Sequence, residues 1–466
     1  MKDTIRIAVV GSGYVGLVAA CCFAEMGHSV VCVDNDWRKV KALQNGESLI
    51  HEKYLPELLD RHRNSKVRFT SNLSEAAHQA DVIFIAVGTP QGDSGEADLS
   101  YVEAVASEIA RSLTTYKVIV EKSTVPVYTN EWIRRVMERN GVAQHLFDVI
   151  SNPEFLREGT AIEDFLHPDR IVVADCSRAA ALLSKIYEPL TDGSYYERPD
   201  AIDGFRNPSA PPPLLHASTK SAEIIKHASN AFLALKISFI NAVSNLCEAV
   251  DADVEQVARG MGMDSRIGLR FLRPGIGYGG SCFPKDVAAF RCVAEQLGVD
   301  FALLTEVENI NADQKRRFLN KVRSALWTLR GKKIGVLGLS FKGGTDDIRE
   351  SPAVDLVQML LAEGCSISAF DPAAMERAAL VLPSCPNLRF MSDAYATAND
   401  AEALLILTDW EEFSRLDLQR LNRSMRYPIV IDGRNLYDPK VMIENGISYF
   451  SVGRSTRERA REFVAA

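Results

Sequence analysis

The stretch Ile5-Arg-Ile-Ala-Val-Val-Gly-Ser-Gly-Tyr-Val-Gly16 decides the fold of the first half of the chain. Its apolar beginning predicts a buried strand, and the helical pattern that follows the glycines predicts a helix. In such a unit Gly11 permits a tight turn, Gly13 lets a pyrophosphate approach the backbone, and Gly16 lets helix and strand pack closely. The phosphates then lie at the helix N-terminus. The predicted dinucleotide-binding turn consists of Gly11, Gly13, Tyr14, Val15 and Gly16.

The end of the next predicted strand indicates which dinucleotide binds. Asp34 ends the strand Ser29–Asp34, where a carboxylate can accept hydrogen bonds from the 2′ and 3′ hydroxyls of a ribose. A carboxylate there repels a 2′-phosphate, so NAD is favoured over NADP. Arg38 lies one helical turn further on and weakens this preference. The alternative, a tight turn without a ligand, is disfavoured because the glycines follow a strand and open a helix.

Two later strand ends add polar side chains to the same edge of the predicted sheet. Thr89 follows one apolar strand, and Ser123 and Thr124 follow the next. Ligands of doubly wound sheets bind outside the carboxyl ends of the strands, so these hydroxyls are well placed for the cofactor. Such residues are also common as simple caps, and for Ser123 both interpretations remain open.

The remaining pattern completes the first α/β half and predicts a second one. In the first half, short strands fit residues 67–70, 81–87, 117–121, 148–151 and 170–174, mostly separated by helical stretches, which argues for a parallel, doubly wound sheet. A helical run without Gly or Pro follows Thr219, with a break expected near Asp251. Near Gly331 the strand–turn–helix pattern restarts, and strands fit residues 366–370, 403–408, 428–432 and 447–451.

We therefore predict an α/β protein with two Rossmann-like, doubly wound domains joined by a long central helix. The predicted domains are residues 1–205, which bind NAD, residues 206–328, which form the central helical region, and residues 329–466. A long helical spine commonly carries dimer contacts, so a homodimer is expected. The proline-rich connector over residues 192–216 has no predicted role, and the tail after Gly453 is expected to be loosely attached.

Composition excludes several classes of function. The 466 residues are 47% apolar and 24% charged with a net charge of −8, which is ordinary for a soluble protein and argues against nucleic-acid or membrane partners. No apolar run approaches the ~20 residues needed to cross a bilayer, and the chain begins with a strand rather than a signal peptide. The nine cysteines lack Cys-x-x-Cys spacing, which predicts neither disulfides nor a metal site. We expect a cytoplasmic protein whose partner is a small-molecule substrate.

The segment Gly275-Ile-Gly-Tyr-Gly-Gly-Ser-Cys-Phe-Pro-Lys-Asp286 predicts a nucleophile. Pro284 suits the first turn of a helix, so we expect the helix to begin near Phe283 with Cys282 at its positive end. The free N–H groups and the helix dipole stabilise a thiolate there and lower the pKa of Cys282. The glycines leave room for a ligand near the backbone. The alternative, a buried structural cysteine, does not explain so many glycines around one thiol.

An ordered set of motifs then identifies a family. The motifs are Gly11-Ser-Gly-Tyr-Val-Gly16, Gly88-Thr-Pro90, Ser123-Thr-Val-Pro126, Asn152-Pro-Glu-Phe-Leu-Arg-Glu-Gly159, Lys226-x-x-x-Asn230, Gly279-Gly-Ser-Cys-Phe-Pro-Lys-Asp286, Gly338-Leu-Ser-Phe-Lys342, Asp346-Asp-Ile-Arg-Glu-Ser-Pro352 and Asp432-Gly-Arg434. With them the chain resembles the UDP-glucose/GDP-mannose dehydrogenase family over nearly its whole length.

The resemblance implies a reaction in which the C6 hydroxymethyl group of a nucleotide sugar, UDP-glucose above all, becomes a carboxylate with two NAD+ and one water. Cys282 is implied to attack the intermediate aldehyde, and the resulting thiohemiacetal is oxidised to a thioester that water hydrolyses. Covalent attachment keeps the reactive aldehyde from escaping between the two oxidations.

The resemblance also assigns roles to the polar residues. Lys226 and Asn230 lie four apart on a helix, hence on one face, and are implied to point at C6, where Lys226 stabilises oxyanion charge. Asp286 and Thr124 match the pair that binds the reacting water. Glu158 is the candidate general base, whereas Glu154 also fits a structural role at a helix entry.

Further contacts are implied by the same resemblance. The implied cofactor contacts beyond the first turn are Asp34, Arg38, Thr89, Ser123, Thr124, Glu158, Lys285 and Arg349. The implied substrate contacts are Phe155, Leu156, Arg157, Glu158, Lys226, Asn230, Phe271, Leu272, Tyr278, Gly279, Cys282, Phe341, Lys342, Arg434 and, from the neighbouring subunit, Arg266. The C-terminal domain is implied to bind UDP.

Three rival functions remain. GDP-mannose and UDP-N-acetylmannosamine 6-dehydrogenases share the chemistry, although the cysteine loop favours the UDP-glucose type. A simple 3-hydroxyacid dehydrogenase would leave Cys282 and the second α/β half without a role. An inactive NAD-binding scaffold is disfavoured because Cys282, Lys226, Asn230 and Asp286 are all present. His227, where tyrosine is common, is a departure from the family pattern that does not affect these residues.

Overall fold

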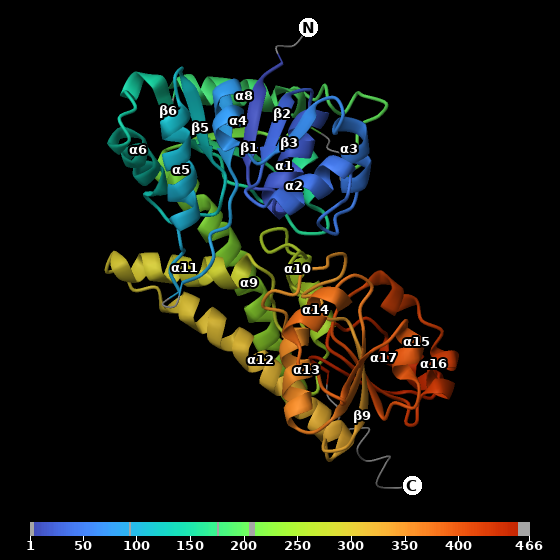
Figure 1. The fold of residues 1–466 in the computed structure, drawn as a ribbon. Coiled ribbons are helices and arrows are strands. Elements are labelled where there is room, and N and C mark those ends of the chain that lie inside the picture. Colours follow the sequence, from blue (N-terminus) through green and yellow to red (C-terminus); the bar gives the residue numbers. More distant parts are fainter. Residues whose placement is uncertain (1–3, 93–94, 175–176, 205–209, 455–466) are drawn as a thin grey trace. The chain divides into compact units, whose positions relative to one another are not determined.

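The computed structural model describes residues 4–92, 95–174, 177–204 and 210–454 (Figure 1). The chain divides into two compact units, Met1–Ser229 and Asn230–Ala466. The three-domain division stays a prediction. The predicted loose tail lies largely outside the described residues, as does part of the proline-rich connector.

The N-terminal unit contains a six-stranded parallel sheet with the order β3-β2-β1-β4-β5-β6. Its strands are β1 (Arg6–Val10), β2 (Ser29–Val33), β3 (Val67–Thr70), β4 (Val82–Ile85), β5 (Lys117–Glu121) and β6 (Phe147–Ser151), with β7 (Ile171–Ala174) and β8 (Leu214–Ala217) in a separate parallel pair. Its helices are α1 (Tyr14–Glu25), α2 (Trp37–Asn45), α3 (Leu55–His62), α4 (Leu73–Gln79), α5 (Ser100–Ser112), α6 (Thr129–Arg139), α7 (Ala161–Leu166) and α8 (Ser177–Thr191), with the 3-10 turn η1 (Gln144–Leu146).

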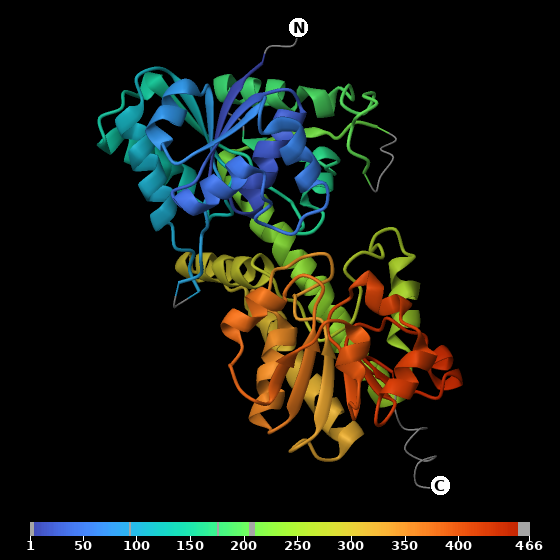
Figure 2. The ribbon, with the colours of Figure 1, turned by 45° about the vertical axis from the view of Figure 1, so that its right-hand side comes forward.

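Helices cover both faces of this sheet, as the near-continuous apolar strands require. Alternate residues of β1 enter two separate cores: Ile7 and Val9 pack with α1, α3, α7 and α8, whereas Ala8 and Val10 pack with α4, α5 and α6. Figures 1 and 2 show the two helical layers on opposite sides of the strands. This order and layering confirm the predicted Rossmann-like fold.

The C-terminal unit repeats the same strand order as β11-β10-β9-β12-β13-β14. Its strands are β9 (Lys333–Leu337), β10 (Ser366–Phe370), β11 (Leu388–Phe390), β12 (Ala403–Ile406), β13 (Ile429–Asp432) and β14 (Ser448–Ser451). Its helices are α10 (Val254–Gly262), α11 (Phe283–Gln296), α12 (Ala302–Leu326), α13 (Pro352–Ala362), α14 (Met375–Val381), α15 (Ala394–Ala398), α16 (Leu418–Ser424) and α17 (Pro439–Glu444), with the 3-10 turn η2 (Glu411–Arg415). The second Rossmann-like half is thereby confirmed.

The predicted long helix is α9 (Thr219–Val250), and its first part belongs to the N-terminal unit. The break expected near Asp251 is confirmed, because Asp251 has a φ of +64° and Asp253 then caps α10 by accepting from the Glu255 N–H. Two strands, β8 and β11, were not predicted. The prediction that residues 170–174 join the main sheet was wrong, since β7 pairs only with β8, which follows a proline-rich segment.

The prediction that no segment is long and apolar enough to cross a bilayer was wrong. Helix α9 has 32 residues and a hydropathy of 1.3 in its most apolar window, which is long and apolar enough to span a bilayer. However, its polar side chains contact protein groups: Lys226 pairs with Glu154, and Lys236 donates to the Ile267 carbonyl. A core helix of a soluble protein passes the same test, so α9 carries no argument for a membrane.

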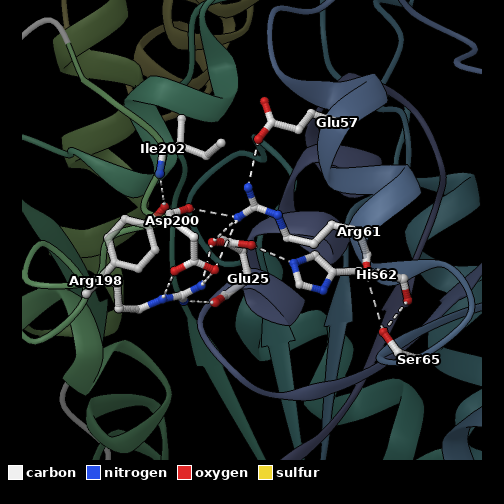
Figure 3. A network of polar contacts seen from close by, with 9 residues as sticks. Glu25, Glu57, Arg61, His62, Ser65, Arg198, Asp200 and Ile202 are labelled. Atoms are coloured by element: carbon white, nitrogen blue, oxygen red, sulfur yellow. Dashed lines mark hydrogen bonds and ion pairs between the residues drawn. The ribbon is translucent and has the colours of Figure 1, made fainter.

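A buried polar network attaches the described part of the proline-rich connector to the N-terminal unit (Figure 3). The fully buried Glu25 carboxylate at the end of α1 accepts from Arg61 and His62 of α3 and from Arg198 of the connector. Burial acts to raise the pKa of Glu25, but the contacts with His62 and the two arginines outweigh it and lower the pKa. The connector therefore packs against α1 and α3, which lie far from it in the sequence.

Candidate active site

The predicted dinucleotide turn has the geometry that its glycines require. Gly11 has a φ of +105°, and a Cβ atom there would lie 2.4 Å from the Ala86 carbonyl oxygen. A Cβ atom at Gly16 would lie 1.9 Å from the Gly11 carbonyl oxygen, so only glycine lets α1 pack this closely on its own turn. A Cβ atom at Gly13 would meet nothing within 4 Å, which leaves open space beside the N-cap of α1.

This open space fits the pyrophosphate of NAD. Gly13 is the N-cap of α1, no side chain caps that helix, and its first turn contains no acidic residue. The positive end of the helix is therefore not neutralised by an acidic residue of its own first turn, and it can accept an anion. Tyr14 and Val15 form the start of the same helix, as predicted.

Asp34 lies beside this turn, at the end of β2. Its carboxylate accepts from the Ser12 N–H at 2.9 Å, from the Ser12 hydroxyl at 2.6 Å and from the Asp36 N–H at 3.0 Å. Burial acts to raise the pKa of Asp34, but these hydrogen bonds and Lys39 outweigh it and lower the pKa. Asp34 is thus an ionised, oriented hydrogen-bond acceptor, and its contact with ribose hydroxyls stays a prediction. Arg38 donates its N–H to Asp36, and its guanidinium lies over Trp37 rather than on Asp34.

The hydroxyls predicted at the next two strand ends connect their loops to each other. Thr89 donates to the Thr124 carbonyl at 2.8 Å, and Ser123 donates to the Val87 carbonyl at 2.8 Å. These reciprocal contacts order the loops after β4 and β5 relative to one another. For Ser123 the structure thus shows a structural role, while a cofactor contact stays a prediction.

Lys226 of α9 forms a buried ion pair in the N-terminal unit. Its Nζ lies 2.8 Å from Glu154 Oε1, and both side chains are almost completely inaccessible to solvent. Glu154 also accepts from the Leu156 N–H at 2.5 Å, which orders the segment that contains Phe155, and Phe155 lies under the Lys226 ammonium. The ammonium is therefore oriented by one carboxylate and one ring.

A second lysine, which sequence reasoning missed, lies in the same region. Lys122 is buried directly after β5 and donates to the side-chain oxygen of Asn152 at 3.2 Å, while the Tyr187 hydroxyl donates to the same atom. Burial lowers the pKa of Lys122 to about 8, with the Lys226 cation acting in the same direction and Glu154 opposing it. The signal in the sequence was the charged pair Glu121-Lys122 directly after the apolar run Val118-Ile-Val120.

The segment with the candidate base Glu158 is ordered by another missed residue. Glu52 is buried between α2 and α3, and its two carboxylate oxygens accept from the Gly159 N–H at 2.7 Å and the Ala161 N–H at 2.6 Å. These contacts cap the turn directly after Glu158. The neighbouring Arg157 is bound to Asp164, so its guanidinium forms an ion pair within the segment.

The C-terminal unit assembles the groups around Cys282. Cys282 is partly exposed and is the N-cap of α11, as predicted, with Ser281 Oγ 3.6 Å from its sulfur. Asp286, fully buried in the first turn, accepts from Asn230 Nδ2 at 2.6 Å and pairs with Lys285 at 3.0 Å. The structure thus brings four predicted residues together within one unit: Asn230, Cys282, Lys285 and Asp286.

The glycines before Cys282 are needed for close packing in this unit. Cβ atoms at Gly277, Gly279 and Gly280 would lie 2.7 Å from Asn311, 2.1 Å from the Glu350 carbonyl and 2.8 Å from the Phe341 ring. Asn311 of α12, which sequence reasoning missed, accepts from the Tyr278 N–H and donates to the Tyr278 carbonyl. The cysteine loop is therefore held on two sides.

Arg434 connects this loop to the turn after β9, the segment from Gly338 to Lys342. Its guanidinium donates to the carbonyls of Leu407 at 2.8 Å, Phe341 at 2.9 Å and Gly277 at 3.4 Å. Phe341 and Lys342 thus lie beside the loop that carries Tyr278 and Gly279. Nearby, the ring of Phe271 contacts that of Phe283, and Leu272 is buried in the core of α9 and α10.

Two predicted arginines are bound to their own neighbours. Arg266 is highly exposed and pairs with Asp264 at 2.6 Å, which leaves it at the surface, where a residue acting on a second subunit would lie. Arg349 pairs with Asp347 at 2.6 Å, and its carbonyl accepts from the Gly280 N–H.

The second Rossmann-like half has a carboxylate at the position that corresponds to Asp34, but the surroundings of this carboxylate differ. Asp371 follows β10 as Asp34 follows β2, and it accepts from the Ser340 N–H and hydroxyl as Asp34 does from Ser12. However, Trp410 donates to the same oxygen and Asp371 is completely buried. Its carboxylate therefore cannot accept from ribose hydroxyls, and the NAD site lies in the first half.

Comparisons with known proteins agree along the whole chain. Sequence models of the UDP-glucose/GDP-mannose dehydrogenase family match residues 5–191 with the NAD binding domain, 220–313 with the central domain and 335–439 with the UDP binding domain. The UDP-glucose 6-dehydrogenase of Bacillus subtilis (strain 168) is 42% identical over 96% of this chain and 93% of its own. That of Rhizobium meliloti (strain 1021) is 44% identical over 97% and 100%. A solved UDP-glucose dehydrogenase from the archaeon Pyrobaculum islandicum is 38% identical, covers 97% of each chain and has a TM-score of 0.84.

Proposed function

Because the chain belongs to the UDP-glucose/GDP-mannose dehydrogenase family and is an NAD-dependent oxidoreductase, we propose that it oxidises C6 of UDP-glucose to the carboxylate of UDP-glucuronate through a covalent bond to Cys282. The observation that carries the covalent step is the position of Cys282. This residue is partly exposed at the N-terminus of α11, one turn before the buried Asp286–Asn230 pair. The N–H groups and dipole of the helix end favour a thiolate.

The residues along α9 supply the other chemical groups. Asn230 lies one turn after Lys226 on the same helix, so both side chains leave the same face. Lys226 stabilises the negative charge that develops on the C6 oxygen as its proton leaves. Asn230 and Asp286, together with Thr124, orient the water that accepts or donates this proton.

The bound NAD supplies the hydride acceptor in each of the two oxidations. After the first, the Cys282 sulfur adds to the aldehyde carbon and forms a thiohemiacetal, whose oxygen takes up a proton. In the second oxidation the hydroxyl proton of the thiohemiacetal passes to the ordered water as the hydride leaves, and the same carbon becomes a thioester. Water attacks it as Glu158 takes its proton, the carbon–sulfur bond breaks, and the Cys282 thiolate is regenerated. The product carbon is then a carboxylate.

The substrate is proposed to be UDP-glucose rather than another nucleotide sugar. Support comes from the names of the two curated relatives at 42% and 44% identity and from the UDP binding domain that matches residues 335–439. The alternatives are GDP-mannose and UDP-N-acetylmannosamine. The cytoplasmic location predicted from the sequence stays a prediction.

A substrate panel with counted NADH tests the reaction. We expect UDP-glucose to yield two NADH per molecule, and UDP-galactose, GDP-mannose and UDP-N-acetylmannosamine to react at least about a hundredfold more slowly in kcat/KM, the scale of a mismatched polar pocket. If another nucleotide sugar reacts preferentially and yields two NADH per molecule, that sugar is the substrate and the type of reaction is unchanged. One NADH per UDP-glucose would contradict the four-electron reaction.

We further propose a homodimer in which α9 packs against α9 of a second copy. Phe232, Phe239, Leu246 and Val250 are between 48% and 64% exposed, and their spacing of seven, seven and four residues lies on one face of the helix. A continuous apolar stripe of this kind is unusual on a monomer and fits a second copy of itself.

Light scattering tests this proposal. We expect the wild type to have twice the mass of one chain and a Phe239→Glu/Leu246→Glu variant to have the mass of one, because the two carboxylates that each copy would bury at the interface are uncompensated. An exposed residue elsewhere, Leu380→Glu, is the control and should leave the mass unchanged. A dimer that survives the double substitution would exclude this face.

A further inference from the structure

Two glutamates in the N-terminal unit lie side by side in the core without a cation between them. Glu121 is the last residue of β5, and Glu223 lies on the first turns of α9. Both are almost completely buried, and one hydrogen-bond network links them: Asn130 donates its backbone N–H to Glu223 and its side-chain amide to Ser151, whose hydroxyl donates to Glu121. The charge of each carboxylate acts on the other, and two ionised carboxylates so placed in the core would repel strongly, so one of them must retain a proton.

The hydrogen bonds around the pair decide which carboxyl is the acid. Both oxygens of Glu223 accept from backbone N–H groups at the start of α6, from Tyr128 at 2.9 Å and from Asn130 at 3.0 Å. Glu223 therefore caps α6, whose positive end stabilises a carboxylate. Glu121 accepts only from a neutral hydroxyl, that of Ser151 at 2.9 Å. Burial, together with the negative charge of Glu223, raises the pKa of Glu121 well above its usual range.

The pair joins two segments that carry proposed catalytic residues. Glu121 lies immediately before the loop that contains Ser123 and Thr124, and Glu223 lies three residues before Lys226 on α9. His227, one residue further, lies with Nε2 2.8 Å from the carbonyl of Val125 in the same loop. Loop and helix are therefore joined at two points, one on each side of Lys226 in the sequence.

We propose that Glu121 and Glu223 share a single proton, with Glu121 as the acid and Glu223 as the carboxylate, and that this pair positions Lys226 and the Thr124 loop for the oxidation of C6. The proposal rests on the proposed function, which places Lys226 and Thr124 at the reacting carbon. Neither glutamate touches the substrate, so both are positioning residues. Other titratable or charged groups around the pair are Glu131, which is paired with Lys220 at the surface, and His227.

Because the two carboxyl groups share one proton, a glutamate-to-glutamine substitution has different effects at positions 121 and 223. In Glu121→Gln the amide nitrogen donates to Glu223 and the amide oxygen accepts from Ser151, so the native contacts are kept at every pH. In Glu223→Gln an NH2 group replaces one oxygen that accepts a backbone N–H, and the cap of α6 is broken. We expect kcat within about threefold of wild type for Glu121→Gln and a loss of about tenfold to a hundredfold for Glu223→Gln, with little change in KM for NAD.

The pH dependence of stability follows from the raised pKa of Glu121. Above the ordinary carboxyl pKa, about 4.3, the unfolded chain releases this proton, whereas the folded protein keeps it up to the raised pKa. Wild-type stability therefore falls across that interval relative to a chain with an uncharged amide. We expect the Tm of Glu121→Gln to approach that of wild type near pH 5 and to exceed it by a growing margin as the pH rises.

The decisive experiment combines these readouts in the full-length protein. Thermal unfolding of wild type, Glu121→Gln, Glu223→Gln and the exposed control Glu108→Gln is followed across pH, with kcat and KM measured on each. Infrared spectroscopy of wild type should show a protonated carboxyl band at neutral pH that disappears in Glu121→Gln. A Tm difference independent of pH, an absent band, or equal losses at the two positions would overturn the proposal.

These outcomes are separable from failure of the proposed function. The unfolding series and the carboxyl band need no turnover, so they stand even if Cys282 is not the nucleophile. Conversely, an active-site chemistry through Cys282 survives if Glu121 proves to be ionised. If Glu223→Gln does not fold, Glu121→Gln alone still decides the protonation of the pair.

Discussion

Replacement of Cys282 by serine is expected to lower kcat at least about a thousandfold, the scale on which loss of a covalent nucleophile acts. A serine hydroxyl at the N-cap of α11 fits the space but is not ionised near neutral pH, so no thioester forms. The dissociation constant for UDP-glucose, measured by calorimetry, should change less than about threefold, because the loop packing by Gly279 and Asn311 is unchanged.

The structure offers a matched control for this variant. Among the eight cysteines in the described ranges, Cys282 and Cys385 are partly exposed and the other six are buried. Cys385→Ser should keep full activity. In that background, alkylation by iodoacetamide, located by mass spectrometry, should occur at Cys282 and be slowed by UDP-glucose. Glucuronate formation at a normal rate by Cys282→Ser would exclude the covalent route.

Replacement of Lys226 by methionine is expected to lower kcat by about a hundredfold to a thousandfold with KM for UDP-glucose changed little, because the ammonium stabilises charge that appears only during oxidation. The same change leaves Glu154 buried without its cation, which costs about 3–5 kcal/mol of stability. A loss of activity could then result from misfolding alone.

A double variant separates these two effects. Lys226→Met/Glu154→Gln removes the uncompensated charge, while the amide oxygen still accepts from the Leu156 N–H. We expect Tm to recover most of its loss in the double variant and kcat to stay low. Recovery of kcat together with Tm would show that Lys226 is structural and would assign the oxyanion contact to another group, with the buried Lys122 as one candidate cation in the N-terminal unit.

The fold was predictable where local pattern and packing agree. The glycines of residues 11–16, the break at Asp251 and the start of α11 at Phe283 were all confirmed, because each depends on a few adjacent residues. Strands β8 and β11 escaped prediction since one follows a proline-rich segment and the other has three residues. The pairing of β7 with β8 depends on distant chain segments that no local pattern specifies.

The sequence by itself determined the chemical types in the site: a cysteine at a helix start, a lysine and an asparagine one turn apart on α9, and an acidic residue at the end of β2. Only the tertiary structure decided their electrostatic surroundings. It pairs Lys226 with Glu154, buries Asp371 completely beneath Trp410 while the Asp34 side chain stays 9% exposed, and links Glu121 to Glu223 although they are 102 positions apart in the sequence. The physical reason is that charge and protonation depend on burial and on through-space partners, and those are set by packing rather than by neighbours along the chain.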